Sequence, residues 1–205
     1  MKLAARAVTA QPFHAMSIGA RAGELERQGH SIAKLSLGEP SFGAPPAVRE
    51  AMCEVMDGRP LAYTPALGHP ALRETISGFY RERHGVDVDP ARIVVTTGAS
   101  SALLLVTLAT VDAGDEVVIA DPSYPCNREL VEAAGGTLAM VPTTVSGRFQ
   151  LDLAGVQEAW SERTNAVMIA TPSNPTGTSV PFEELAAICR YAQEHGAWRI
   201  VDEIY

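Results

Sequence analysis

Lysine and cysteine are both scarce in this sequence. Only two of its 16 basic residues are lysine, Lys2 and Lys34, and the others are arginine. The three cysteines, Cys53, Cys126 and Cys189, are odd in number and far apart in the chain. This spacing excludes a disulfide framework and the paired cysteines of a zinc site, and it favours a reducing compartment, the cytoplasm.

Long apolar runs and an excess of positive charge are missing as well. The longest apolar stretch, residues 102–109 with Thr107 inside it, is too short to span a bilayer. Lys2 and Arg6 are not followed by the apolar segment of a signal peptide. The formal net charge of −8 argues against nucleic acids and anionic membranes as partners, because both attract basic proteins.

What the sequence does contain is typical of a globular protein. Its 205 residues are 46% hydrophobic and 20% charged, which is an ordinary composition. Before residue 90, apolar residues at helical spacing and prolines at helix starts predict helices over residues 14–28, 46–56 and 70–84. A short strand is expected over residues 32–37, ahead of a turn-rich segment at 38–43.

From residue 92 onwards, short apolar segments alternate with segments of helical pattern. This alternation predicts βα units and an α/β fold, a three-layer α/β/α arrangement around a mostly parallel sheet. The chain stops directly after its last strand, so we expect it to be the front part of a longer protein. The strands are expected at residues 93–95, 116–120, 137–141, 166–170 and up to Val201, and the helices at 99–111, 127–134, 153–160 and 181–194.

Two polar segments stand between an expected strand and the helix after it. Residues 96–101 contain Gly98 and small hydroxyl residues at a helix N-terminus, where backbone N–H groups can bind a phosphate without any lysine. In residues 121–125, Tyr124 stands between two prolines and has little freedom, which suits stacking on an aromatic ring. An ordinary capped turn and a rigid proline turn are the alternatives for these two segments.

Residues 97–101 also look like the start of the dinucleotide-binding loop of short-chain dehydrogenases. The later glycines of that loop are absent, because residues 102–104 are apolar, and the loop lies far from the N-terminus. In addition, Tyr191 is followed four residues later by His195 and not by lysine. These departures argue against a nicotinamide cofactor.

Two further polar segments follow later strands. Asn174, within residues 171–177, can donate through its amide to a ring oxygen. Asp202 directly follows the apolar pair at 200–201. A plain Asn-Pro turn and a helix N-cap are the ordinary alternatives. Because ligands of α/β sheets bind beyond the carboxyl ends of the strands, we expect the four segments to surround one crevice.

The order of these segments resembles that of the class I/II aminotransferases, which are fold-type I enzymes that use pyridoxal 5′-phosphate (PLP). The resemblance covers nearly the whole chain, and its segments follow the family's order. It implies an enzyme that moves an amino group between an amino acid and a 2-oxo acid. The matching segments are residues 37–40, 63–65 with Gly68 and 72–73, 97–100, 122–125, 174–177 and 202–205.

The resemblance implies roles for residues around the PLP ring. Asp202 would pair with the protonated pyridine nitrogen, because a nearby carboxylate stabilises that cation. Tyr205 and Asn174 would hydrogen-bond the ring 3′-oxygen, and Tyr124 would stack on the ring. Tyr124 and Asn174 would also contact the substrate, and the peptide bond between Asn174 and Pro175 would be cis.

By the same resemblance, Ala99 and Ser100 hold the phosphate of the cofactor, and Gly38 lines the site for the substrate carboxylate. Tyr63 is implied to reach the phosphate of the cofactor in the neighbouring subunit. The implied assembly is a homodimer with shared active sites.

The family's Schiff-base lysine, which follows the Asp-x-x-Tyr motif, has no counterpart in this chain. No catalytic residue is therefore expected within it, and the chain resembles roughly the N-terminal half of an enzyme. Residues 1–45 are expected to form an N-terminal arm and part of a small domain, and residues 46–205 the N-terminal portion of the large PLP-binding domain. Other PLP chemistry on the same fold, that of a β-lyase or a synthase, and a non-catalytic PLP-binding module are the alternatives.

Overall fold

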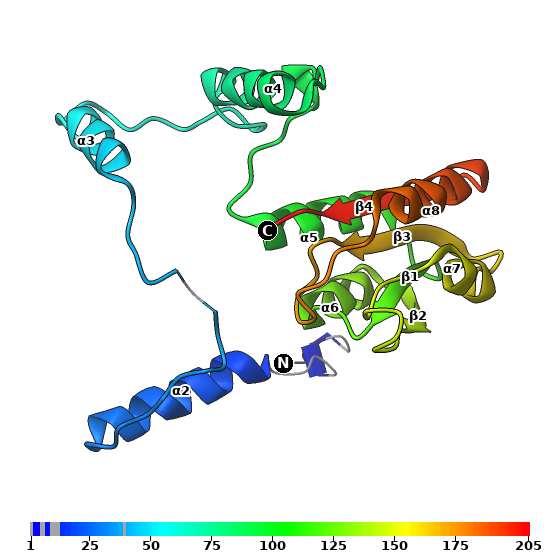
Figure 1. Ribbon diagram of the computed structural model, residues 1–205. Coiled ribbons are helices and arrows are strands. Elements are labelled where there is room, and N and C mark those ends of the chain that lie inside the picture. Colours follow the sequence, from blue (N-terminus) through cyan, green and yellow to red (C-terminus); the bar gives the residue numbers. More distant parts are fainter. Residues whose placement is uncertain (1, 5–6, 9–12, 39) are drawn as a thin grey trace. The chain divides into compact units, whose positions relative to one another are not determined.

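The chain divides into two units. Figure 1 shows its helices and strands in the computed structural model. One unit comprises residues 11–95, and the other comprises residues 96–205 together with residues 1–10. The domain boundary expected after residue 45 stays a prediction. None of the described helices is both long and apolar enough to cross a lipid bilayer. The residues that the structure describes are 2–4, 7–8, 13–38 and 40–205.

The unit of residues 11–95 is helical, and proline begins two of its α-helices. Pro46 and Pro70 occupy first helical positions, where the N–H group that proline lacks has no partner in any case. The last long helix ends at Gly85, whose φ of +67° is the left-handed conformation of a common C-cap. The predicted helices are confirmed as α2 (His14–Arg27), α3 (Pro46–Val55) and α4 (Pro70–His84), which the 3-10 helix η1 (Pro90–Arg92) follows.

Two strands that the sequence predicts in this unit are not formed. Neither residues 32–37 nor residues 93–95 are strands in the structure, so both predictions were wrong. A strand requires a neighbouring strand to pair with its backbone. The bond from Val95 N to Leu67 O, which is 3.0 Å long, joins residues 93–95 to a loop and not to a strand.

The unit of residues 96–205 is built on a four-stranded sheet in which every pairing is parallel. The order of the strands is β2-β1-β3-β4, so the chain starts near the middle of the sheet and later crosses β1 to form the other half. The parallel sheet that the alternating pattern predicts is confirmed. The strands are β1 (Glu116–Asp121), β2 (Thr137–Pro142), β3 (Thr164–Ala170) and β4 (Trp198–Asp202).

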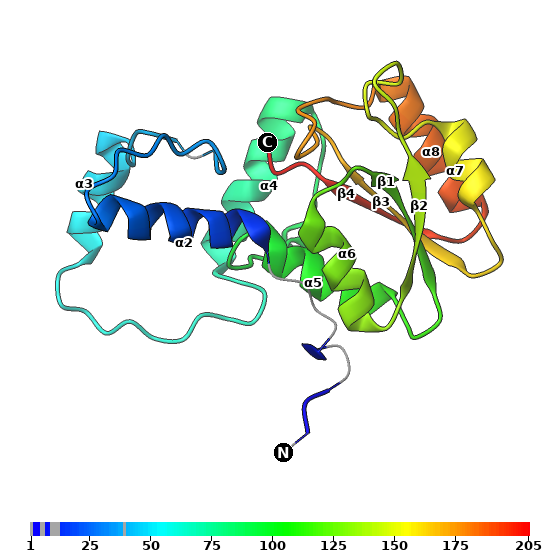
Figure 2. The same ribbon diagram turned by 90° about the horizontal axis from the view of Figure 1, so that it is seen from below.

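Helices cover both faces of this sheet, and Figure 2 shows α5 and α6 on one side and α7 and α8 on the other. Along β1, Val117 and Ile119 pack in the core beneath α5 and α6, whereas Val118 packs in the core beneath α7 and α8. Full burial of each such side chain is worth roughly 1.5–3 kcal/mol. The three-layer arrangement is thereby confirmed, with α5 (Ala99–Thr110), α6 (Pro125–Ala134), α7 (Leu153–Ala159) and α8 (Phe182–Glu194).

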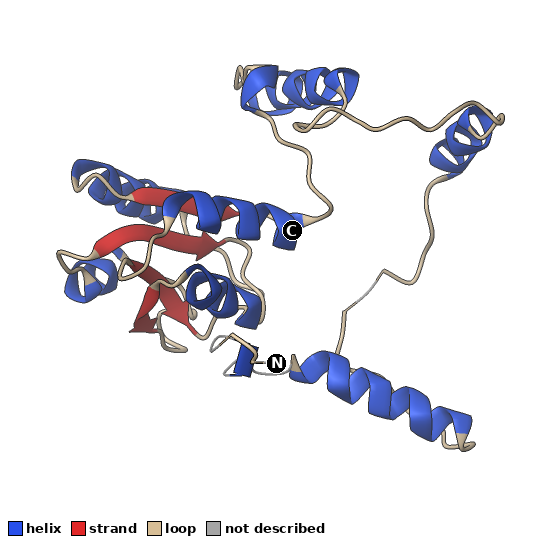
Figure 3. Cartoon of the chain, turned by 180° about the vertical axis from the view of Figure 1, so that it is seen from behind, coloured by secondary structure: helices blue, strands red, loops and turns tan. Residues whose placement is uncertain are grey.

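The helices that follow the two central strands, β1 and β3, pack on opposite faces of the sheet. The helix after β1 is α6 and the helix after β3 is α8, and they lie on different sides of the sheet, as seen from behind in Figure 3. Where neighbouring parallel strands diverge in this way, a crevice opens beyond their carboxyl ends. This is the place at which a ligand site is expected.

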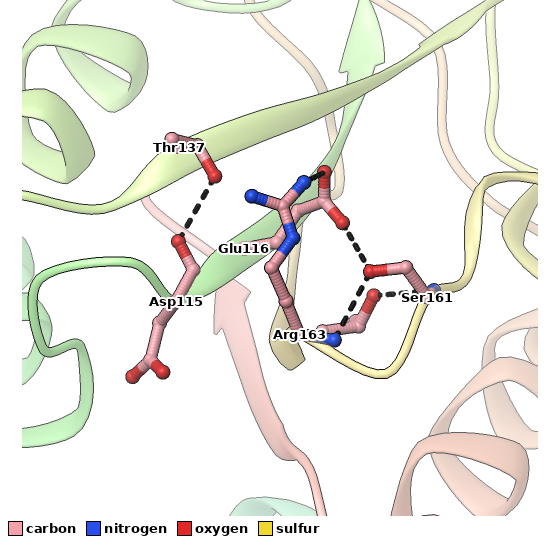
Figure 4. Close-up of polar contacts among 6 residues, drawn as sticks. Asp115, Glu116, Thr137, Ser161 and Arg163 are labelled. Carbon is pink, nitrogen blue, oxygen red and sulfur yellow. Dashed lines mark hydrogen bonds and ion pairs between the residues drawn. The ribbon is translucent and has the colours of Figure 1, made fainter.

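A small polar network lies at the other end of the sheet, beside the amino end of β1 (Figure 4). The carboxylate of Glu116 accepts a hydrogen bond from Ser161 Oγ and lies 3.5 Å from Nη2 of Arg163. Thr137 Oγ1 donates to the carbonyl oxygen of Asp115 at 3.1 Å. These bonds hold the amino end of β1 to β2 and to the turn before β3, away from the carboxyl ends.

Candidate functional site

The N-terminus of α5 offers backbone N–H groups for an anion. The residue before the helix, Gly98, has φ +92° and ψ 167°, a conformation that residues with a Cβ atom avoid. Gly98 has no side chain with which to cap this helix. The N–H groups of the first turn, which begins at Ala99 and Ser100, have no intrahelical acceptor, as in any α-helix. The positive end of the helix dipole adds to them.

Tyr124 is positioned between the end of β1 and the start of α6. It is half-buried and is the residue directly before the helix. A hydrogen bond with Cys126, followed by burial and by the charges of Cys126 and Tyr205, raises the pKa of the Tyr124 hydroxyl to about 12. The phenol is therefore uncharged at neutral pH, and its ring is available for stacking as a neutral aromatic surface.

Asn174 lies in a tight loop after β3. The peptide bond between Asn174 and Pro175 is cis, as predicted. The loop is closed by two backbone bonds, from Ser173 N to Thr178 O at 2.8 Å and from Gly177 N to Ser173 O at 2.7 Å. The half-buried Asn174 side chain is thus carried by a backbone that its own hydrogen bonds hold in place.

Asp202 is the last residue of β4, and its backbone is anchored by the neighbouring strand end. Thr171 N donates to Asp202 O at 3.0 Å, and Asp202 Oδ1 accepts from Ile204 N at 3.1 Å. Within the described ranges no hydrogen bond reaches the other carboxylate oxygen, Oδ2. A half-buried carboxylate with one oxygen in a turn can hold a cationic N–H group with the other.

A cavity of about 240 Å³ brings most of the predicted site residues together. It lies within the unit of residues 96–205. The helix N-terminus comes from α5, and the remaining groups follow β1, β3 and β4, as the rule for parallel sheets requires. The predicted residues that line the cavity are Ala99, Ser100, Tyr124, Asn174, Asp202 and Tyr205.

Two predicted site residues belong to the other unit. Tyr63 and Gly38 lie within residues 11–95, and both are exposed in this chain. A Cβ atom added to Gly38 would meet no atom of the described residues within 4 Å. The roles that the sequence predicts for these two residues stay predictions.

Some residues that line the cavity were not predicted. Leu103 lies one turn after Ala99 and Ser100 on α5, so helical spacing could have placed it there. Ala170 is the last residue of β3, and Ile204 separates Asp202 from Tyr205. Apolar residues of this kind are far more often core than lining, which is why they gave no signal.

The cavity combines groups that suit a flat, charged molecule. A helix N-terminus binds an anion, a neutral phenol ring stacks on an aromatic ring, and a carboxylate holds a cation. The amide of Asn174 and the hydroxyl of Tyr205 can donate to an oxygen on that ring. The residues could therefore hold an aromatic cofactor that carries a phosphate and a basic nitrogen.

Comparison with known sequences places the chain among aminotransferases. The family "Aminotransferase class I and II" matches residues 30–205. The valine–pyruvate aminotransferase of Mycobacterium tuberculosis is 40% identical over 194 residues, which are 95% of this chain and 50% of that protein. The aspartate/prephenate aminotransferase of Thermus thermophilus is 36% identical over 203 residues, 99% of this chain and 53% of that protein.

Solved structures resemble the fold over its full length. An aminotransferase from Mycobacterium tuberculosis superimposes with a TM-score of 0.94 at 40% identity, covering 100% of this chain and 52% of that chain. An aspartate aminotransferase from Thermus thermophilus with maleate superimposes with a TM-score of 0.95 at 36% identity. The match covers 100% of this chain and 54% of that chain. This chain spans about half the length of the curated relatives it matches.

Proposed function

We infer, because the chain belongs to the class I and II aminotransferases, that the protein transfers an amino group between an amino acid and a 2-oxo acid. The observation that carries this proposal is that the N-terminus of α5, the ring of Tyr124, the amide of Asn174 and the carboxylate of Asp202 line one cavity. The two substrates share a carboxylate and differ at the carbon that gains or loses nitrogen. Both would enter the same cavity in turn.

Pyridoxal 5′-phosphate is the cofactor that we propose for this cavity. It carries a phosphate, a flat aromatic ring and a basic ring nitrogen, and the chain offers a matching group for each of them. The N-terminus of α5 fits the phosphate, the ring of Tyr124 fits the aromatic face, and the carboxylate of Asp202 fits the nitrogen. When bound, PLP supplies an electron sink for the pair left behind as the α-proton departs.

Each residue of the cavity then has a defined task. Asp202 keeps the proton on the ring nitrogen, because a nearby negative charge favours the cationic form. Asn174 and Tyr205 donate to the ring 3′-oxygen and fix the orientation of the ring. Tyr124 stacks on one face, and with Asn174 it also contacts the substrate. A partly buried setting strengthens these electrostatic contacts relative to water.

The phosphate would be held by the chain without a lysine. The N–H groups at Ala99 and Ser100 and the Ser100 hydroxyl are the proposed donors. Neutral donors at a helix end bind a phosphate through aligned dipoles. The positive φ of Gly98 lets the backbone approach the anion closely, because no side chain stands in the way.

A homodimer with shared sites is the assembly that we propose. Tyr63 is fully exposed in this chain, which fits a residue that reaches the phosphate of a neighbouring subunit's cofactor. Among the described residues, none crowds Gly38, which fits a lining for the substrate carboxylate. Sedimentation that shows a fully active monomer would exclude the shared site.

A cytoplasmic location is proposed from the state of the cysteines. Cys53, Cys126 and Cys189 are all free thiols in the structure. Free thiols persist in the reducing cytoplasm and are oxidised more readily elsewhere. Cell fractionation tests this assignment. Recovery of the protein outside the cytoplasmic fraction would contradict it.

The activity is tested with the full-length protein, PLP and paired substrates. Valine with pyruvate is the first pair, because the Mycobacterium tuberculosis relative is named for it; aspartate with a 2-oxo acid is the second. We expect the donor's 2-oxo acid to form only when an acceptor is added. Formation of a 2-oxo acid without an acceptor would instead indicate a lyase and contradict the proposal.

Replacing Tyr124 with alanine is expected to weaken PLP binding. The substitution removes ring stacking, which is worth roughly 0.5–1.5 kcal/mol for an aromatic pair. PLP affinity should therefore fall by up to about tenfold, since about 1.4 kcal/mol corresponds to one factor of ten. Titration of the apoenzyme, followed by PLP absorbance, measures the change, with Tyr124→Phe as the control that keeps the ring. Equal affinities of Tyr124→Ala and wild type would show that Tyr124 is misplaced.

The lysine that binds PLP covalently is expected outside residues 1–205. Such a lysine must lose its proton near neutral pH, whereas the ammonium group of Lys34 lies 2.7 Å from the carboxylate of Glu26 in an exposed pair. Lys2 is exposed as well. Borohydride reduction of the full-length protein with PLP, followed by peptide mapping, should therefore label a peptide from outside this range. A stoichiometric label on Lys34 would overturn the assignment.

A further inference from the structure

A second, much smaller cavity lies behind the wall of the candidate site. Its volume is about 20 Å³, and Ala170 lines both it and the larger cavity. It is surrounded by the carboxyl ends of β1 and β3, by the first turn of α6 and by residues 149–151. A cavity needs a volume of about 10–15 Å³ to admit one water molecule. The small cavity can therefore hold one water, but it is too small for a substrate or a cofactor.

Two polar side chains that line this cavity each have one buried atom without a hydrogen-bond partner among the described residues. They are Ser123, through its Oγ atom, and Asn127, through its Oδ1 atom, and both atoms are buried. Asn127 is only 3% exposed. A buried polar atom without a partner is costly, and most such atoms in folded proteins bond to protein or to ordered water.

We propose that the small cavity is a binding site for one ordered water molecule, which bridges Ser123 and Asn127. Water can donate to a carbonyl oxygen or accept from an amide nitrogen, so it satisfies Asn127 in either orientation of the amide. The hydroxyl of Ser123 can donate to the same molecule or accept from it. Satisfying two buried polar atoms outweighs the entropy lost by one immobilised water.

The bridge has a structural consequence for Tyr124. Ser123 precedes Tyr124 in the chain, and Asn127 N donates to Tyr124 O at 3.0 Å. The water therefore ties the backbone on both sides of Tyr124 together. The same cavity is walled by Ser173, directly before Asn174, so the water lies between the two loops that carry these site residues. This inference does not depend on the proposed function.

The first test is a crystal structure of the full-length protein at a resolution that reveals water. We expect one ordered water about 2.5–3.0 Å from Ser123 Oγ and about 2.5–3.2 Å from the Asn127 amide. A cavity without water density, or a direct bond between the two side chains, would overturn the proposal.

The second test is a double-mutant cycle with Ser123→Ala, Asn127→Leu and the double variant. Each single variant leaves one polar partner of the water behind, so the melting temperature should fall by at least about 2 °C. The double variant should lose clearly less than the sum of the two, because neither polar partner is then left unsatisfied. Strict additivity would show that the two residues do not share a water.

Thr107→Val is the matched control for this cycle. Thr107 Oγ1 is also buried without a partner among the described residues, but Thr107 does not line the small cavity. Removing its hydroxyl should leave the melting temperature unchanged or raise it. Hydrogen exchange of the peptide over residues 121–128 should accelerate in Asn127→Leu and stay unchanged in Thr107→Val. Unchanged exchange in both variants would contradict the bridge around Tyr124.

Discussion

The variant Asp202→Asn is expected to lower the kcat of the proposed amino transfer by about 10²- to 10³-fold in the full-length protein. The substitution keeps the shape of the side chain and removes its charge. Removing one preorganised electrostatic group that faces the charge developing in a reaction costs about 2.7–4 kcal/mol of transition-state stabilisation, and the carboxylate of Asp202 is half-buried. At about 1.4 kcal/mol per factor of ten, this gives the stated loss.

The physical reason for this loss is the proton on the ring nitrogen of PLP, the cofactor proposed for the cavity. A carboxylate favours the protonated, electron-withdrawing ring, whereas the neutral amide of asparagine does not. The variant should still bind PLP, since the groups at α5 and the ring of Tyr124 are intact. We therefore expect kcat to fall far more than PLP affinity, which separates loss of catalysis from loss of cofactor.

Glu203→Gln is the matched control for this prediction. Glu203 is the next residue, carries the same charge and is exposed, and it does not line the cavity. An exposed charge contributes little to a site that it does not face. Its kcat should stay within about twofold of wild type. Equal losses in both variants, or a full kcat in Asp202→Asn, would remove Asp202 from the ring nitrogen.

Much of the unit of residues 96–205 could be predicted from the sequence. Hydrophobic periodicity and turn residues marked its strands and helices, because each element there has an apolar face that must be buried. The same signal failed at residues 32–37 and 93–95. β-branched residues show that a segment can be extended, but they do not show whether a neighbouring strand exists to pair with it.

The candidate site could be predicted to a similar extent and for a similar reason. Asp202 ends a strand of the parallel sheet, and Asn174 and Tyr124 each follow one, so topology alone brings them to the carboxyl ends of the strands. The unsatisfied pair Ser123 and Asn127 could not be foreseen. Whether a buried polar atom finds a partner depends on how loops pack around it, which no local pattern encodes.

The variant Ile188→Ala is expected to lower the free energy of unfolding by about 2–5 kcal/mol. Ile188 lies on α8 and is completely buried in the core between α8 and the sheet, with Val118 and Val167 in the same cluster. Truncation removes buried methyl and methylene groups and leaves a cavity that rigid strands cannot collapse to fill. Urea unfolding of the full-length protein, followed by circular dichroism, measures the loss.

Phe182→Ala serves as the control on the same helix. Phe182 is the first residue of α8 and is 78% exposed, although its side chain is larger than that of Ile188. If burial and not size sets the cost, truncating Phe182 should change the free energy of unfolding by no more than about 0.5 kcal/mol. The core is assigned to the wrong face of α8 if Phe182→Ala proves the more damaging of the two. A loss confined to Ile188→Ala places the stabilising contact where α8 covers the strands whose carboxyl ends form the candidate site.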